Sequence, residues 1–332
     1  MNLDFYGFLS KPFETTPDPR FLYLAPGHRE ALAQLTYGLQ EGKGFILLTG
    51  EVGTGKTTLL QALFKRLDAK TAVAFVFNTT LPFDQIIEYV LEDLGIPRPG
   101  DSQAQRLFAL NTFLTERCRA GLRTVLIVDE AQNLSPETLE QIRLLSNFET
   151  PTEKLLQIVL VGQPELRAKL DLPDLRQLKQ RIGLRYHIPP LTAKETRDYI
   201  RTRVRIAGGD IGLFTEAALA RIATHTQGIP RRVNILCDHC LLIGYADQQR
   251  RIDRDIVQEA IEYLDDGPRR STRARATARG PLSLFTGWAA LGAVGLLGVA
   301  VVSAAIHPDL LDAFGAAGIA EWARMIRGVI LR

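Results

Sequence analysis

Cysteine is scarce in this sequence, which has only Cys118, Cys237 and Cys240 among its 332 residues. A small, odd number of cysteines cannot form the paired disulfide framework of a small secreted protein. We therefore expect most of the chain to fold in a reducing compartment. Residues 1–10 also lack a basic segment followed by a long apolar run, which predicts that there is no signal peptide.

A large excess of charge of either sign is also missing. The 40 lysines and arginines nearly balance the 37 aspartates and glutamates, so the net charge is +3. Such a value gives no argument by itself for nucleic acid as a partner. Apolar residues make up 46% of the chain and charged residues 23%, which fits a folded protein and excludes an intrinsically disordered one.

Charge is absent altogether from residues 282–306, an apolar run of about 25 residues. As a helix the run would be about 37 Å long, and the hydrocarbon core of a bilayer is about 30 Å thick. Its many glycines leave a buried pair of core helices as the alternative. We expect a single transmembrane helix, because no polar face interrupts the run and arginines gather on one flank. These arginines are Arg269, Arg270, Arg273, Arg275 and Arg279.

The expected transmembrane helix fixes the topology of the remaining chain. Arginine-rich flanks stay on the cytoplasmic side, so residues 1–266 are predicted to lie in the cytoplasm, anchored at the inner membrane. The basic linker, residues 267–281, is then placed to attract anionic lipid headgroups. Residues 307–332 would emerge beyond the membrane as a short amphipathic helix.

The first 190 residues alternate apolar runs of strand length with helical periods. This order predicts an α/β fold, a parallel sheet with helices on both faces that makes three layers. The expected strands are residues 45–49, 73–77, 124–128, 156–161 and a short one at 185–188. The expected helices include residues 28–41, 56–67, 83–94 and 103–119, and another opened by Ser135 and Pro136.

An all-helical domain is expected after Pro189 and Pro190, where the strand patterns stop. Thr192 and Glu195 form a capping box, which signals the start of the first of about four helices that run to Leu264. The boundary is predicted near Leu191, so the two domains cover residues 1–190 and 191–266.

A glycine-rich turn joins the first predicted strand to the next helix. It reads Gly50-Glu51-Val52-Gly53-Thr54-Gly55-Lys56-Thr57-Thr58, and its first eight residues match the phosphate-loop pattern G-x-x-x-x-G-K-[ST]. Backbone N–H groups of such a loop, together with the helix N-terminus, bind phosphates. Lys56 is predicted to contact the β- and γ-phosphates, and Thr57 to bind Mg²⁺. The flanking strand and helix argue against a chance match, so residues 50–58 are predicted to bind ATP.

Two acidic residues, Asp129 and Glu130, follow the third predicted strand. Ligands of open α/β sheets bind at the carboxyl ends of the strands, where the phosphate loop also lies. Asp129 is predicted to hold Mg²⁺ through water, and Glu130 to act as general base on the attacking water. The alternative is an acid pair merely solvated in a loop, which is a poor fit when the same sheet carries a phosphate loop.

Fast phosphoryl transfer also needs a cation close to the γ-phosphate. Arg176, Arg181 and Arg185 lie between the fourth and fifth predicted strands, at the edge of the sheet. From there an arginine would reach a neighbouring subunit's site more easily than its own, which predicts a homo-oligomer. Each of the three is otherwise an ordinary surface charge.

Four motifs stand out beside the phosphate loop: Phe5-Tyr6-Gly7-Phe8, Asp129-Glu-Ala-Gln-Asn-Leu134, Leu160-Val-Gly-Gln-Pro-Glu-Leu166 and Gly228-Ile-Pro-Arg-Arg-Val-Asn234. Together with residues 11–13, 16–23, 28–32 and 49–57, they resemble general secretion pathway protein A. This family contains membrane-anchored AAA+ ATPases, with relatives in pilus-biogenesis and exopolysaccharide or exosortase loci. The resemblance covers about residues 1–264 and implies an AAA+ fold with a C-terminal helical lid.

The resemblance also implies roles for single residues. Gln163 would be the sensor-1 residue, which contacts the γ-phosphate or the attacking water. Arg181 would be the arginine finger, and Arg231 would be sensor 2, through which the lid contacts the nucleotide. Residues 23–28 would pack near the adenine.

The function implied is that of a membrane-anchored motor that uses Mg·ATP to assemble or remodel a cell-envelope secretion, pilus or exopolysaccharide system. Its partners would be copies of itself and proteins of the envelope machinery. Secretion members usually continue into a sizeable periplasmic part, and residues 308–332 are too few for a peptidoglycan-binding domain, so cell-wall binding is not expected.

Two other functions remain as alternatives. One is a DNA-handling AAA+ protein of the transposition-helper or initiator type, against which the apolar run and the lack of a winged-helix pattern argue. The other is a nucleotide switch that does not hydrolyse ATP, against which the intact acid pair argues. Basic helix faces such as Arg201, Arg203 and Arg205 are interpreted as solvated rather than as a nucleic-acid surface.

The spacing of Cys237 and Cys240, with His225 nearby, raises the question of zinc. No second cysteine pair completes a tetrahedral site. Both cysteines fall within a helical apolar pattern, so we expect them in a hydrophobic core.

Overall fold

A computed structural model of the chain describes residues 3–14, 18–77, 81–97 and 100–266. The predicted linker, transmembrane helix and tail, residues 267–332, lie outside this part. Among the described residues, none of the helices combines the length and apolar character needed to cross a membrane. The anchor at residues 282–306 therefore stays a prediction.

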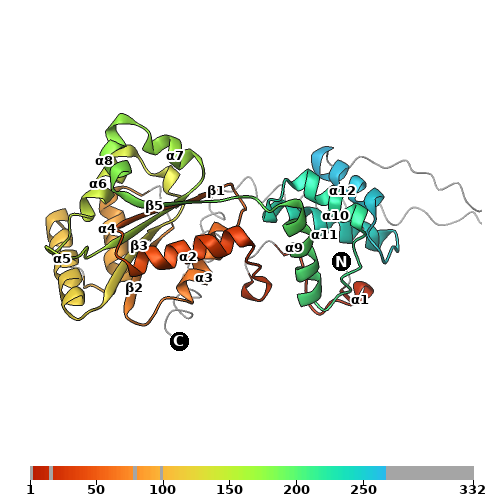
Figure 1. The fold of residues 1–332 in the computed structure, drawn as a ribbon, viewed down its shortest axis with the longest axis horizontal. Coiled ribbons are helices and arrows are strands. Elements are labelled where there is room, and N and C mark those ends of the chain that lie inside the picture. Colours follow the sequence, from red (N-terminus) through yellow and green to blue (C-terminus); the bar gives the residue numbers. More distant parts are fainter. Residues whose placement is uncertain (1–2, 15–17, 78–80, 98–99, 267–332) are drawn as a thin grey trace, which may run out of the picture. The chain divides into compact units, whose positions relative to one another are not determined.

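Five parallel strands form one sheet in the order β2-β3-β4-β1-β5 (Figure 1). Their bounds are β1 Phe45–Gly50, β2 Thr71–Val76, β3 Arg123–Val128, β4 Gln157–Gly162 and β5 Ile182–Ile188. Every residue of β1 and β4 is buried, as expected for central strands covered on both faces. The predicted parallel α/β sheet is confirmed.

Strand β5 is longer than the predicted 185–188, because it begins at Ile182. It lies at the sheet edge and pairs only with β1 among the described strands. Its residues are therefore partly exposed, and Gly183 and Arg185 break the apolar run by which a buried strand is recognised.

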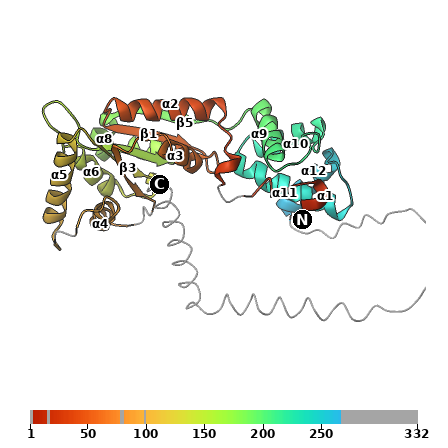
Figure 2. The same ribbon diagram turned by 90° about the horizontal axis from the view of Figure 1, so that it is seen from below.

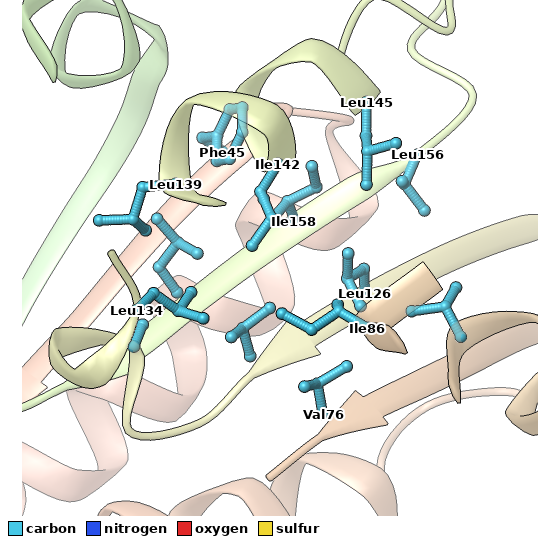
Figure 3. Close-up of a cluster of buried hydrophobic side chains, with 14 of the residues drawn as sticks. Phe45, Val76, Ile86, Leu126, Leu134, Leu139, Ile142, Leu145, Leu156 and Ile158 are labelled. Atoms are coloured by element: carbon cyan, nitrogen blue, oxygen red, sulfur yellow. The ribbon is translucent and has the colours of Figure 1, made fainter. Parts of the chain in front are cut away.

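One face of the sheet packs against α4, Phe83–Asp93, and α6, Pro136–Leu145 (Figure 3). Alternate strand residues such as Leu126 and Ile158 enter this core together with Ile86 and Ile142. Beside them lie α5 Gln103–Arg119, α7 Glu165–Leu170 and α8 Arg176–Arg181. Helices α2, Pro26–Gln40, and α3, Lys56–Phe64, contact β1, and Figure 2 shows α2 running along the sheet.

Four helices follow the last strand: α9 Ala193–Ile206, α10 Glu216–Thr226, α11 Pro230–Ala246 and α12 Arg254–Asp266. The predicted capping box opens α9, since the Glu195 N–H donates to Thr192 Oγ1 and the Thr192 N–H donates to Glu195 Oε2. The four-helix prediction is confirmed, whereas the exact domain boundary near Leu191 stays a prediction.

These four helices share their core with the N-terminal segment. Tyr6, Phe8, Phe13 and Phe21 are buried with residues of α9 to α12. The short helix α1, Leu3–Tyr6, belongs to this segment. Although these aromatics precede the sheet in sequence, they pack with helices that follow it, which no local pattern could predict.

Arg203 corrects one prediction. It was expected on a solvated basic face with Arg201 and Arg205, but it is only 7% exposed. Its guanidinium donates to the carbonyl oxygen of Pro12 and to Tyr199 Oη (2.9 Å), and it lies over the Phe21 ring. The N-terminal segment covers this side chain and supplies one of its hydrogen-bond acceptors, the Pro12 carbonyl oxygen.

The turn between α10 and α11 is pressed against the segment that leads into α9. Gly228 has φ +71°, its carbonyl oxygen accepts the Leu191 N–H (2.9 Å), and a Cβ there would overlap the Leu191 carbonyl. Gly121 has a similar φ, +68°, but open space around it.

We expect Gly228→Ala to destabilise the protein more than Gly121→Ala. Both changes impose about 1–2 kcal/mol of left-handed backbone strain, and the Leu191 overlap adds about 1–3 kcal/mol at residue 228 only. In thermal unfolding, the Tm of Gly228→Ala should lie below that of Gly121→Ala by about 2–4 °C for each kcal/mol of this added cost. Equal Tm shifts would show that the Leu191 contact does not constrain this turn.

Candidate functional site

The phosphate loop lies between the end of β1 and the start of α3, as predicted. Gly53 and Gly55 have φ +81° and +95°, the left-handed region that favours glycine. A Cβ on Gly53 would come within 2.6 Å of Arg231 Cβ, and a Cβ on Gly55 within 3.3 Å of His28 Nε2. The loop therefore needs glycine both for its backbone and for close approach of its neighbours.

Lys56 lies buried beneath this loop. Its ammonium donates to the carbonyl oxygens of Gly50 (2.9 Å) and Glu51 (3.1 Å). Burial lowers the pKa of Lys56, and the carboxylates of Glu130 and Asp129 act in the opposite direction. Lys56 thus places a positive charge at the phosphate loop, close enough to Asp129 and Glu130 for their charges to act on it.

Thr57 and Asp129 meet beside the loop, as a shared Mg²⁺ site requires. Thr57 Oγ1 donates to Asp129 Oδ2 over 3.4 Å, and the Glu130 N–H donates to Asp129 Oδ1 over 2.9 Å. Asp129 is 6% exposed, and this burial raises its pKa. A hydroxyl and a carboxylate are the hard oxygen ligands that Mg²⁺ prefers, so the donor set fits the ion.

Glu130 and Gln163 are brought together because β3 and β4 are neighbours in the sheet. Gln163 Nε2 donates to Glu130 Oε2 (3.2 Å). A second amide, that of Gln132, donates to the same oxygen over 2.6 Å. Sequence reasoning missed Gln132, although it is only two residues from Glu130 within a quoted motif.

A cavity of about 390 Å³ opens beside the phosphate loop. Tyr23, Leu24 and His28 line it together with Gly53, Gly55 and Thr58, so the segment expected near the adenine lies next to the loop. A volume of this size suits a small-molecule ligand. Contact of this segment with adenine remains a prediction.

His28 supports the loop from the start of α2. Its Nε2 lies 2.8 Å from the Thr54 carbonyl oxygen, and burial lowers the pKa of the imidazole. A neutral ring is therefore expected at pH 7, and because a carbonyl oxygen only accepts, Nε2 carries the proton. The hydrogen bond fixes the loop residue that precedes Gly55.

Arg231 reaches the same cavity from the first turn of α11. Its backbone N–H donates to the Gly53 carbonyl oxygen (3.2 Å), and the residue lines the cavity. The structure thus places the predicted sensor-2 residue against the phosphate loop. The role itself stays a prediction.

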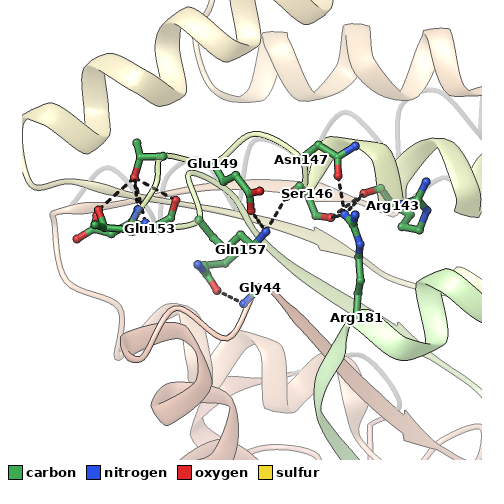
Figure 4. A network of polar contacts seen from close by, with 11 residues as sticks. Gly44, Arg143, Ser146, Asn147, Glu149, Glu153, Gln157 and Arg181 are labelled. Carbon is green, nitrogen blue, oxygen red and sulfur yellow. Dashed lines mark hydrogen bonds and ion pairs between the residues drawn. The ribbon is translucent and has the colours of Figure 1, made fainter.

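Arg181 is far from the other predicted site residues. It precedes Ile182, which pairs with Phe45 at the start of β1, whereas the phosphate loop follows the end of that strand. Five residues of strand separate the two ends by about 17 Å. The Arg181 guanidinium donates to Ser146 Oγ and to Asn147 Oδ1 (2.7 Å) at the end of α6 (Figure 4).

This position agrees with the prediction that Arg181 would not serve its own site. Arg176 and Arg185 are exposed like Arg181, and Arg185 donates to the Lys179 carbonyl oxygen. Which of the three would act on a neighbouring subunit stays a prediction.

The two close cysteines are core residues, as predicted. Cys237 and Cys240 are both fully buried in α11, and burial raises the pKa of each thiol. Within the part of the chain that the structure describes, no group of three or more His, Cys, Asp or Glu side chains could hold a metal ion.

The sequence has clear relatives. Residues 39–170 match the family model described as an AAA domain. Over 293 residues the chain is 42% identical to the General secretion pathway protein A of Aeromonas hydrophila, a match that covers 87% of this chain and 53% of that protein. The chain thus spans about half the length of this relative.

Solved structures share the fold. The Aeropyrum pernix ORC2 protein has a TM-score of 0.59 at 20% identity, covering 77% of this chain and 72% of its own. The Cdc6p protein of Pyrobaculum aerophilum has a TM-score of 0.58 at 24% identity, covering 75% of this chain and 71% of its own. At these identities the likeness supports the P-loop fold alone.

Proposed function

Because the chain belongs to the AAA+ proteins related to general secretion pathway protein A, we propose that it binds Mg·ATP and hydrolyses it. The observation that carries the proposal is that the carboxyl ends of three neighbouring strands, β3, β4 and β1, bring the site residues together. The phosphate loop follows β1, Asp129 and Glu130 follow β3, and Gln163 follows β4. Thr57 contacts Asp129, and Gln163 contacts Glu130. The ORC2 protein, which has the same fold, is described in ADPNP-ADP complexes, so this fold can accommodate such nucleotides.

The residues have separate tasks in this proposal. Backbone N–H groups of the loop and the Lys56 ammonium would bind the phosphates. Thr57 and Asp129 would hold Mg²⁺, which offsets phosphate charge when bound. Glu130 would accept a proton from the attacking water, and Gln163 would orient that water.

A second subunit completes the proposed site. Arg181 is exposed and too distant from its own phosphate loop, so its guanidinium would serve the site of a neighbouring copy. We further propose that residues 282–306 anchor the protein in the inner membrane near anionic lipids, with the ATPase part in the cytoplasm. Its partners would be cell-envelope assembly proteins, an inference from the name of the related secretion protein.

DNA handling is the second candidate function, and it is favoured by the fold shared with the Aeropyrum pernix ORC1 protein, which is described in complex with DNA. That likeness is at 19% identity, compared with 42% for the secretion protein. We therefore rank the envelope function first.

The test is phosphate release by the full chain in lipid vesicles with Mg·ATP. We expect turnover that stops when EDTA removes Mg²⁺, and turnover per subunit that rises with protein concentration because Arg181 acts between subunits. No turnover would favour a nucleotide switch and overturn the hydrolase. DNA binding that weakens steeply with salt, in the same preparation, would favour the second candidate.

A further inference from the structure

We propose that Gln132 is a positioning residue for Glu130, one that holds the carboxylate of the general base and ties it to β4. The inference rests on the proposed ATP hydrolysis. The backbone of Glu130 has a conformation that is unusual for a residue other than glycine.

Glu130 has φ +52°, in the left-handed region, a conformation that costs of order 1–3 kcal/mol. Hydrogen bonds to the N–H group and to the carbonyl oxygen of Glu130 hold its backbone in this conformation. The Glu130 N–H donates to Asp129 Oδ1 (2.9 Å), and the Glu130 carbonyl accepts the Asn133 N–H (3.0 Å). The short 3₁₀ turn that follows, Ala131–Asn133, turns the chain so that the side chain of Gln132 can reach back to Glu130.

The amide of Gln132 is bonded at both ends. Its Nε2 donates to Glu130 Oε2 (2.6 Å), and its Oε1 accepts the backbone N–H of Gln163 (3.1 Å). A flipped amide would set an oxygen against a carboxylate and an NH₂ group against an N–H, so only one orientation satisfies both bonds. The side chain of Gln163 then supplies a second donor to the same Glu130 oxygen.

Two neighbours keep Gln132 in this position. A Cβ on Gly162, at the end of β4, would lie 2.7 Å from Gln132 Oε1, so glycine makes room for the amide. Lys169 on α7 donates to the carbonyl oxygens of Gln132 and Leu134, which fixes the backbone of the turn. Gln132 is therefore placed by β4 and α7, and it in turn places Glu130.

A positioning role predicts that turnover falls while the affinity for nucleotide stays the same. Gln132→Leu keeps the approximate volume but removes both hydrogen bonds of the amide. We expect kcat to fall about 10- to 100-fold, because a small misplacement of a catalytic group costs up to about 10²-fold. The Kd of a fluorescent ADP analogue should change less than about threefold, since Gln132 does not line the cavity.

A matched control is Gln141→Leu, the same change at a half-buried glutamine on α6. It should leave kcat, Kd and Tm near the wild-type values. If Gln132→Leu fails to fold, Gln132→Asn gives the same test, because the shorter side chain keeps the amide but cannot span from Glu130 to Gln163.

Gln132→Glu gives a readout that a merely structural role would not move. The glutamate side chain has the length of the glutamine side chain but no N–H group, so it cannot replace the amide donor to Glu130. We expect kcat to fall as in Gln132→Leu, while the Kd of the ADP analogue stays within about threefold of wild type. A parallel fall of kcat in these two variants, one apolar and one polar, would identify the lost hydrogen bond as the cause.

The outcomes separate this inference from the proposed function. A wild-type protein that hydrolyses ATP, together with unchanged kcat in Gln132→Leu, would overturn the positioning role only. A parallel loss of kcat, Kd and Tm would also overturn it, because the residue would then be structural. A wild-type protein without hydrolysis would overturn the proposed function, and this inference with it.

Discussion

Replacing Glu130 by glutamine is expected to lower kcat for ATP hydrolysis about 10²- to 10⁴-fold, the usual contribution of a general base. The amide has the shape of the carboxylate but cannot accept the proton of the attacking water. Glu130 is half-buried at the end of β3, beside the Asp129 carboxylate, which is assigned to Mg²⁺ rather than to the attacking water.

Nucleotide binding should survive this change. Phosphate binding is assigned to residues 50–58, and Thr57 and Asp129 keep their oxygen atoms in the variant. Single-turnover phosphate release, with the Kd of a fluorescent ATP analogue, separates the chemical step from binding. Glu259→Gln, at an exposed position of α12, is the matched control. Unchanged kcat in Glu130→Gln would mean that another group activates the water.

The second large effect is expected from Arg181→Ala. An arginine that stabilises charge on the transferred phosphoryl group is worth about 10³- to 10⁵-fold in kcat. The expected loss is at the lower end of that range, about 10³-fold. The nucleotide affinity of the isolated subunit should be preserved, because Arg181 lies about 17 Å from its own phosphate loop. The same change at Arg176 or Arg185 identifies which of the three arginines carries the effect.

Mixing two inactive variants tests whether the arginine acts between subunits. The Arg181→Ala subunit still has Glu130, and the Glu130→Gln subunit still has Arg181. When the first lies beside the second in the right order, the shared site therefore contains both groups. When equal amounts of the two variants mix at random, about a quarter of the sites should have this arrangement. The turnover of the mixture should therefore rise to about a quarter of the wild-type value. Mixtures that stay inactive would place the catalytic arginine elsewhere.

Loss of structure is the competing explanation for Arg181→Ala. The guanidinium donates to Ser146 Oγ and Asn147 Oδ1, so its removal also breaks these two hydrogen bonds at the end of α6. Ser146→Ala removes one of these contacts and keeps Arg181. If Ser146→Ala and Arg181→Ala lowered Tm and kcat alike, the role of Arg181 would be structural.

Much of this protein could be predicted from the sequence, because the features concerned are local. Continuous apolar runs predict β1 and β4 to within about one residue, since a strand buried on both faces needs apolar side chains at every position. The phosphate loop is contiguous, and its glycines adopt the backbone that no other residue tolerates at low cost. The capping box at Thr192 was likewise predictable from four successive residues.

Other features were decided by the tertiary structure, because they join residues distant in sequence. The contact between Glu130 and Gln163 exists because β3 lies beside β4, a strand order that no single segment encodes. Packing of Phe8 and Phe13 with helices beyond residue 190, and the burial of Arg203 under that segment, depend on side chains about 190 residues apart. Local chemistry in the sequence determined which groups could bind phosphate and activate water, whereas long-range packing decided that Gln132 would hold one of them in place.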